Sequence, residues 1–206
     1  MEMLPLLILL IPFLTFSFFG MPIFISMGMS SLIYVLSFHQ KIPLLVIPAN
    51  MIGVLDSYGF LAIPFFFLAG DLMNTGGITK RLVDFAAALV GHIKGGLSHV
   101  SIIANMIMAG VSGSAIADAS ATGSVLIPAM KKDGYPAPYS AAIVAAAATI
   151  GPIVPPSIPM VIYGLLVNVS IGKLFLAGAV PGFLMGLYLI IASYIISKRR
   201  DFPARP

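Results

Sequence analysis

A run of seven residues, Gly151-Pro152-Ile153-Val154-Pro155-Pro156-Ser157, interrupts an apolar stretch of this chain. The residues before it, 137–150, are rich in alanine, and a second apolar run, 158–167, follows. Proline cannot donate a backbone hydrogen bond and clashes with the preceding helical turn, so the run predicts a break between two helices. Neither flank reaches the ~20 residues that one membrane crossing needs.

Backbone that is not helical within a membrane leaves carbonyl groups without partners. Such groups are tolerated only where protein buries them or where they line a polar cavity. Secondary transporters build their ion and substrate sites from helices broken in this way. The run therefore predicts an ion or substrate site, and the alternative is a short surface loop between two ordinary spans.

The composition indicates an integral membrane protein. Hydrophobic residues make up 59% of the chain and charged residues 9%, whereas a soluble domain carries about 25% charged residues. Cysteine is absent, which excludes disulfides, thiolate metal sites and a cysteine nucleophile. The net charge of +4 comes from short basic clusters between apolar runs, where basic residues set topology. We expect a lipid bilayer and no nucleic acid as a partner, and no cofactor.

We expect an all-α polytopic membrane protein with one membrane domain over residues 1–206. Residues 1–19 are expected to be a retained first span, because no basic segment or cleavage site marks a signal peptide. The expected segments are N-terminal spans over 1–74, an amphipathic interfacial helix over 79–94, a re-entrant hairpin over 95–130, the broken helix over 137–167, a short connection over 169–178 and a last span over 180–197.

The hairpin prediction depends on Ser112-Gly113-Ser114, which interrupts the apolar segment 95–130. Each arm has roughly 15 residues, and at ~1.5 Å per residue neither arm crosses a ~30 Å hydrocarbon core. One long span is the alternative, but the polar residues that cluster after Val111 argue against it. Basic residues at 94, 131–132 and 198–200 predict cytoplasmic ends, so the hairpin would enter and leave on that side.

The hairpin tip carries candidate ligands. Ser112 and Ser114 flank a glycine, and their hydroxyls, together with nearby carbonyls, can ligate a hard cation; close packing of small residues is the alternative. Asp118 follows Ser114 by four residues, on the same helical face. A carboxylate in an apolar segment is a functional candidate, but we favour a structural role in which it hydrogen-bonds the hairpin backbone and holds the tip in shape. Asp71, near a helix end, is expected to be solvated at the interface.

Gly110-Val111-Ser112-Gly113 also matches the G-x-S-G pattern of intramembrane serine proteases. A nucleophilic serine needs a histidine within hydrogen-bond reach, and in that family the histidine follows on a later helix. Here His39, His92 and His99 all precede Ser112. We therefore expect no enzyme activity.

Several motifs in order resemble the large membrane subunit of tripartite ATP-independent periplasmic (TRAP) transporters, of the DctM/SiaM type. They are Ala69-Gly70-Asp71-Leu72-Met73, Gly76-Gly77-Ile78, Arg81-Leu82-Val83, Gly91-His92-Ile93-Lys94-Gly95-Gly96-Leu97, Ser112-Gly113-Ser114-Ala115-Ile116-Ala117-Asp118, Ile150-Gly151-Pro152-Ile153-Val154-Pro155-Pro156-Ser157-Ile158, Phe175-Leu176-Ala177-Gly178 and Pro181-Gly182.

The resemblance implies a multi-pass permease of the bacterial inner membrane that uses sodium as the coupling ion and imports organic acids, such as C4-dicarboxylates or sialic acid, without ATP. Its implied partners are a small TRAP membrane subunit and a periplasmic substrate-binding protein. The implied sodium ligands are the side chains of Ser112 and Ser114 and the carbonyls of Gly151, Val154 and Pro156. Residues that could support this site are Gly113, Asp118, Pro155 and Ser157.

The resemblance also implies a protein about twice this long, built from two inverted repeats. This sequence holds one hairpin and one broken helix. We expect a fragment or a split gene product that lacks the C-terminal repeat. The alternative is a membrane scaffold or assembly subunit that does not transport.

Overall fold

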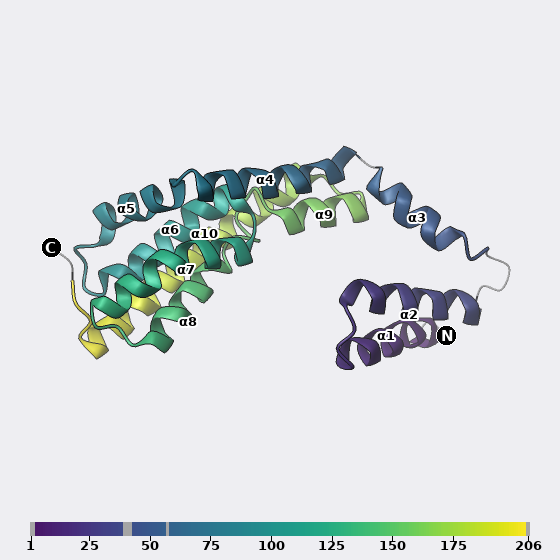
Figure 1. Cartoon of the computed structure of the whole chain (residues 1–206), viewed down its shortest axis with the longest axis horizontal. Helices are drawn as coiled ribbons and strands as arrows, with labels where there is room; N and C mark the ends of the chain where they lie inside the picture. The colour runs from purple at the N-terminus through teal and green to yellow at the C-terminus, as the bar shows by residue number, and fades with distance from the viewer. Residues whose placement is uncertain (1–2, 39–42, 57, 205–206) are drawn as a thin grey trace. The chain divides into compact units, whose positions relative to one another are not determined.

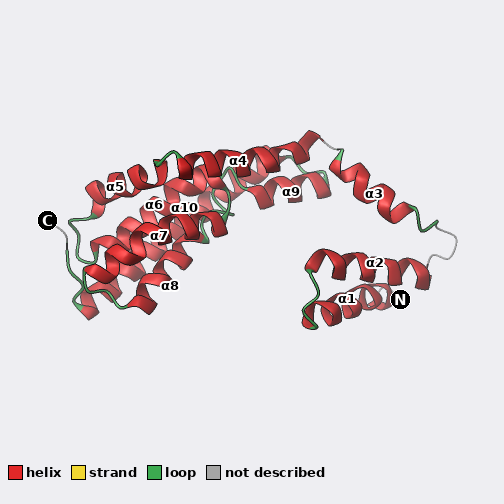
Figure 2. Cartoon of the chain, viewed as in Figure 1, coloured by secondary structure: helices red, strands yellow, loops and turns green. Residues whose placement is uncertain are grey.

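A computed structural model describes residues 3–38, 43–56 and 58–204 (Figure 1). Every regular element within these residues is a helix (Figure 2), which confirms the predicted all-α fold. The chain divides into two compact units, Met1–Ser57 and Tyr58–Pro206. The first holds α1 (Met3–Phe18), α2 (Ile23–Phe38) and α3 (Val46–Leu55). The second holds η1 (Tyr58–Leu61), α4 (Ala62–Thr75), α5 (Ile78–Val90), α6 (Gly96–Ser112), α7 (Ala115–Lys132), α8 (Ala137–Ala148), α9 (Ile158–Val167) and α10 (Ile171–Arg200).

In the first unit, α1 and α2 form a helical hairpin (Figure 1). The chain reverses at Gly20, which has a φ of +81°. Glycine adopts this conformation without a steric penalty because it has no Cβ. The amide of Met21 donates to the carbonyl of Phe16, which closes the turn. Large apolar side chains on both helices are exposed, Leu14 and Phe24 among them, as expected for helices that face lipid.

In the second unit, α4 and α5 are bent by 70° at the two glycines between them. Gly77 has a φ of +74°, so the helix ends where the sequence predicts a stop. In the amphipathic helix that the sequence predicts here, Leu82, Phe85, Ala86 and Leu89 fall at i, i+3, i+4 and i+7. The residues of α5 that are buried within the protein are Thr79, Val83 and Ala86. Because α5 packs against α6 through Val83 and Ala86, Phe85 and Leu89 are left exposed and Leu82 is half-buried.

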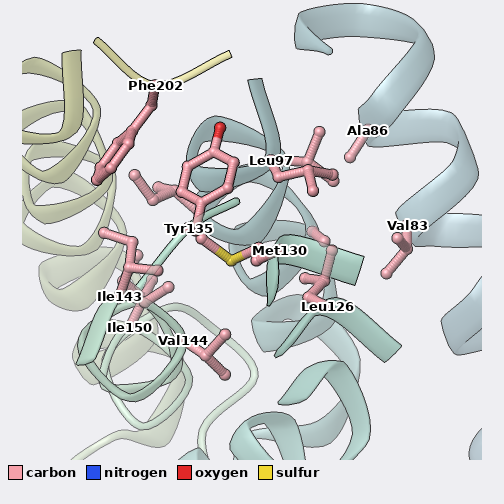
Figure 3. Close-up of a cluster of buried hydrophobic side chains, with 14 of the residues drawn as sticks. Val83, Ala86, Leu97, Leu126, Met130, Tyr135, Ile143, Val144, Ile150 and Phe202 are labelled. Carbon is pink, nitrogen blue, oxygen red and sulfur yellow. The ribbon is translucent and has the colours of Figure 1, made fainter. Parts of the chain in front are cut away.

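Helices α6 and α7 run antiparallel and α8 packs on both, with a core of buried side chains between them (Figure 3). The segment after α10 completes this core. Phe202 is buried, and its ring centroid lies 4.6 Å from that of Tyr135 and 4.8 Å from that of Tyr139. The hydroxyl of Tyr135 donates to the carbonyl of Pro203. The end of the chain therefore packs against the connection between α7 and α8.

The predicted break lies between α8 and α9, but the predicted connection over 169–178 is wrong. Helix α10 begins at Ile171, capped by Ser170, whose hydroxyl accepts a hydrogen bond from the amide of Lys173. Gly178 does not end a helix, because its role is close packing: a Cβ there would lie 2.5 Å from the carbonyl oxygen of Ile153. Helix α10 therefore continues through Pro181 to Arg200.

By length and composition, α10 can cross a membrane, and α4 with α5 can do so if the bent pair is one span. The other apolar helices, including α6, α8 and α9, have 10–17 residues. Short helices that meet at breaks are what the sequence predicts for the hairpin and for the broken helix. Where each element lies in a membrane remains a prediction.

Candidate ion-binding site

Two residues, Gly113 and Ser114, connect α6 to α7 at the tip of the hairpin. Gly113 adopts the left-handed conformation with φ +58°, and Ser114 is extended and caps α7. The hydroxyl oxygen of Ser114 accepts a hydrogen bond from the amide of Ala117 at 3.4 Å, and the hydroxyl oxygen of Ser112 accepts one from the amide of Ser114 at 3.2 Å. Both serine side chains are therefore held at the turn.

Asp118 fixes this turn from within α7. The hydroxyl of Ser112 donates to Oδ1 of Asp118 at 2.5 Å, and Asp118 is fully buried. The second carboxylate oxygen, Oδ2, has no hydrogen-bond partner within the described residues. Asp118 thus holds the tip through the side chain of Ser112. The prediction was a hydrogen bond between Asp118 and the backbone of the hairpin.

A second polar link joins the two arms deeper in the hairpin. The side-chain amide of Asn105, on α6, donates to the hydroxyl of Thr122, on α7, at 3.2 Å. That hydroxyl donates to the carbonyl of Asp118 at 2.7 Å. Both side chains are fully buried. Asn105 was not among the predicted site residues, although an amide in an apolar segment is itself a signal of a polar role.

The tip packs directly against the broken helix. A Cβ at Gly113 would lie 2.8 Å from the carbonyl oxygen of Pro156 and 3.2 Å from the Cα of Ser157. A Cβ at Gly151 would lie 2.7 Å from Oδ2 of Asp118 and 3.3 Å from the carbonyl carbon of Ser114. These glycines allow the backbones to approach closely, so two chain breaks that are distant in sequence meet at one place.

The break supplies carbonyl groups that no helix uses. Ser157 caps α9 by accepting from the amide of Met160 at 3.3 Å, and its hydroxyl donates to the carbonyl of Pro152. Within residues 58–204, no hydrogen bond ends at the carbonyl oxygens of Gly151, Val154 or Pro156. These oxygens remain available to another partner.

The residues of the break contact different neighbours. Val154 packs against α10: a Cβ at Gly182 would lie 2.5 Å from its Cγ2. The carbonyl oxygen of Pro155 lies on the α6 side, 3.9 Å from where a Cβ of Gly110 would be. Gly151, Pro156 and Ser157 contact the tip itself.

Helix α4 adds residues that the sequence analysis did not select. A cavity of about 170 Å³ lies beside the tip and is lined in part by Gly70, Asn74, Ser112 and Ser114. Asp71 lines the same cavity and is exposed. Nothing in the sequence near Gly70 or Asn74 indicated this position, because the contact depends on how α4 packs on α6.

The site fits a hard cation such as sodium. A hydroxyl has one hydrogen and two lone pairs. Ser112 gives its hydrogen to Asp118 and one lone pair to the amide of Ser114, which leaves one lone pair free. Ser114 likewise keeps a lone pair beyond its cap. With the free carbonyls of the break, these atoms form a set of neutral oxygen donors, the type that hard cations prefer.

The arrangement does not resemble a serine protease site. His99 lies thirteen residues before Ser112 in the same helix, which places it about 20 Å away at ~1.5 Å per residue. His92 is exposed, and His39 lies outside the described residues. The hydroxyl of Ser112 bonds a carboxylate, and no described histidine reaches it.

Comparison with known proteins matches residues 10–206 to a family described as "Tripartite ATP-independent periplasmic transporter, DctM component". The sialic acid TRAP transporter large permease protein SiaM of Vibrio cholerae is 48% identical over 157 residues, which cover 76% of this chain and 37% of the relative.

Two further relatives are named for other substrates. The C4-dicarboxylate TRAP transporter large permease protein DctM of Vibrio cholerae is 44% identical over 188 residues, 91% of this chain and 41% of the relative. The 2,3-diketo-L-gulonate TRAP transporter large permease protein YiaN of Escherichia coli is 44% identical over 158 residues, 77% of this chain and 37% of the relative. The chain thus spans well under half the length of these curated relatives.

Proposed function

The chain belongs to the DctM component family of tripartite ATP-independent periplasmic transporters, and we propose that it forms the N-terminal repeat of a sodium-driven large permease. The proposed cargo is an organic acid, because the relatives are named for sialic acid, C4-dicarboxylate and 2,3-diketo-L-gulonate. The proposed partners are a small membrane subunit and a periplasmic binding protein, as the word "tripartite" implies. The proposed location is the bacterial inner membrane, which the chain crosses several times.

One observation carries the sodium proposal: the hairpin tip and the broken helix meet with unused oxygens on both sides. The carbonyl oxygen of Pro156 faces Gly113 at the turn, and the carboxylate of Asp118 holds the hydrogen of the Ser112 hydroxyl. A cation between these elements replaces its hydration shell with hydroxyl and carbonyl oxygens. The residues proposed to hold sodium are Ser112, Ser114, Gly151, Val154 and Pro156.

The same contact explains how an ion can affect transport. The α6–α7 hairpin and the α8–α9 break are separate segments that touch at their least regular points. An ion held by both segments joins them into one unit, and its loss releases them. Alternating access in transporters of this type moves one repeat or bundle against another. The chain supplies one hairpin and one broken helix, so we propose that a second repeat forms the rest of the central cavity.

Sodium binding is tested on the chain itself. The purified chain in mild detergent is heated in sodium chloride, potassium chloride or choline chloride at equal ionic strength. A ligand that binds only the folded state raises the melting temperature. We expect stabilisation by sodium alone, and its loss in Ser112→Ala and Ser114→Ala.

Ser124→Ala is the matched control. Ser124 also lies on α7 and is exposed, and its hydroxyl donates to the carbonyl of Ala121, away from the tip. Sodium should stabilise this variant as much as the natural chain. Equal stabilisation of all three variants would support the alternative that the serines at the tip serve packing alone.

A further inference from the structure

A groove at the opposite end of the hairpin from the ion site has the features of a ligand site. It has a volume of about 290 Å³, lies between α5, α6 and α10, and is lined by Val90, Ile93, His99, Ile103, Ile190, Ile191 and Tyr194. Ligand pockets begin at about this size and combine an apolar lining with a few polar groups. None of these residues takes part in the ion site.

His99 is the buried polar residue among those that line the groove. It is 2% exposed, and neither ring nitrogen makes a hydrogen bond of normal geometry within the described residues, although the backbone of Lys94 lies nearby. A buried polar group without a partner is costly, and native structures rarely leave one. The ring centroid of Tyr194 lies 6.4 Å away, at the more exposed side of the groove.

The groove is ordered along the helix axes. Helices α6 and α10 are antiparallel here: Gly95 packs on Ser197, and Gly186 packs on Met106. Along α6, His99 lies in the first turn and Ile103 one turn deeper. Along α10, residues at i, i+3 and i+7 share one face, so Ile191, Tyr194 and Lys198 follow one another towards the helix end.

Basic residues gather where the groove reaches the helix ends. Lys94 directly follows Ile93, which lines the groove, and α10 ends in Lys198, Arg199 and Arg200. The three side chains of α10 are exposed, and the side chain of Lys94 is about half exposed. Asp201 pairs with Lys94, with 2.5 Å between Nζ and Oδ1. Four basic residues against one acidic residue leave a positive charge at this end.

From the helix end inward, the groove therefore presents basic residues, then the hydrogen-bonding side chains of His99 and Tyr194, and then apolar side chains. A phospholipid has the same order of phosphate, glycerol ester and acyl chain. Basic pockets between helices near the membrane surface suit anionic head groups. Leu187 and Leu184, both exposed, continue the apolar surface of α10 along the path of an acyl chain.

We propose that this groove binds one anionic phospholipid. The phosphate lies at Lys198 and its basic neighbours, an ester oxygen accepts a hydrogen bond from the His99 ring, and an acyl chain follows Ile103 and Ile191. The proposal requires only that the chain lies in a membrane, and it is independent of sodium coupling.

The test is native mass spectrometry of the full chain, released from mild detergent with added dioleoyl-phosphatidylglycerol or dioleoyl-phosphatidylcholine. We expect phosphatidylglycerol to be retained preferentially. The double variant Lys198→Gln/Arg199→Gln should weaken its retention by about 25-fold, because each of the two basic residues near an anionic head group contributes about fivefold.

Lys131→Gln/Lys132→Gln is the matched control, since it removes the same charge at exposed positions that do not line the groove. It should leave retention within about twofold of the natural chain, because surface charges without a built site contribute little. Ile191→Trp, at a half-exposed position, should obstruct the groove and lower the retention of both lipids. Circular dichroism verifies that each variant is folded.

Equal retention of the two lipids, or an equal loss in the two charge variants, would overturn the proposal in favour of a general effect of surface charge. Unchanged retention in folded Ile191→Trp would show that the lipid binds elsewhere. If the groove variants instead lost a co-purified small membrane subunit while keeping phosphatidylglycerol, the groove would be a protein interface and the proposal would be wrong.

Discussion

The hydroxyl of Ser112 donates a hydrogen bond of 2.5 Å to Oδ1 of Asp118, across the turn that joins α6 to α7. Both residues are buried. This bond directs the serine hydrogen into the hairpin and leaves the free lone pair of the same oxygen for a cation. Asp118 therefore acts on the proposed sodium site as a positioning residue, through Ser112.

Replacing Asp118 tests this bond. Asp118→Ala leaves the buried hydroxyl of Ser112 without an acceptor, and we expect the free energy of unfolding to fall by about 1–3 kcal/mol. Asp118→Asn keeps an oxygen that can accept the bond and should lose less. Unfolding in mixed detergent, followed by circular dichroism, measures both. Equal losses would mean that the hydrogen bond to Ser112 is not what Asp118 contributes.

Gly113→Ala tests the contact between the tip and the break. The left-handed conformation costs a residue with a Cβ about 1–2 kcal/mol, and the new Cβ would lie 2.8 Å from the carbonyl oxygen of Pro156. Gly134→Ala is the control, because Gly134 has a φ of +86° and nothing within 4 Å of its Cβ position. We expect Gly113→Ala to be more destabilising than the control by about 1–3 kcal/mol, the usual cost of overpacking. Similar melting temperatures would contradict the close contact.

Pro156→Ala separates coupling from stability. The substitution restores an amide that can donate to the carbonyl four residues earlier, Pro152, in competition with the hydroxyl of Ser157. The helix can then extend into the break and draw carbonyl groups away from the ion. In a full-length permease carrying this substitution, reconstituted with its binding protein, we expect sodium-dependent uptake to fall while the melting temperature changes little. Unaltered sodium dependence would remove Pro156 from the proposed site.

Topology can be tested because the chain has no cysteine. Single cysteines at positions 94, 132 and 199 replace exposed or partly exposed basic residues. Since basic loops resist translocation, we expect all three to be shielded from an impermeant thiol reagent added outside intact cells. Strong labelling at 132 with none at 94 would show that the hairpin spans the membrane, and the re-entrant prediction would be wrong.

The ion pair between Lys94 and Asp201 predicts a pH dependence. The hydrogen bond and charge of Lys94 lower the pKa of Asp201. The pair therefore stabilises the fold above the unfolded-state pKa of about 3.9 and loses this effect as the pH falls through the lower folded-state pKa.

Asp201→Asn removes the charge and suits the left-handed backbone, since Asp201 has a φ of +55°. We expect the natural chain to melt slightly above this variant at neutral pH, and the difference to shrink as the pH falls below about 3.9. The effect should be small and weakened by salt, because the pair is exposed. If the difference in melting temperature persisted at low pH, its cause would be the backbone conformation at position 201 and not the ion pair.

Where the chain breaks could be predicted from sequence, because a break is a local property. Proline lacks the amide that a helix needs, and glycine alone enters the left-handed conformation freely. These facts place the breaks at Gly113 and at residues 151–157 before any packing is known. The same reasoning fails at Gly178 and Pro181, because helix α10 continues through both residues. Gly178 packs closely on the carbonyl of Ile153 and does not end the helix.

The composition likewise indicated an integral membrane protein. Hydrophobic residues make up 59% of the chain, more than a soluble domain of this size usually contains. The tertiary structure alone decided which breaks meet. The approach of Gly113 to Pro156, the position of Asn74 beside the serines, and the burial of Phe202 against Tyr135 all join residues far apart in sequence. Such contacts depend on how whole helices pack, which no local pattern specifies.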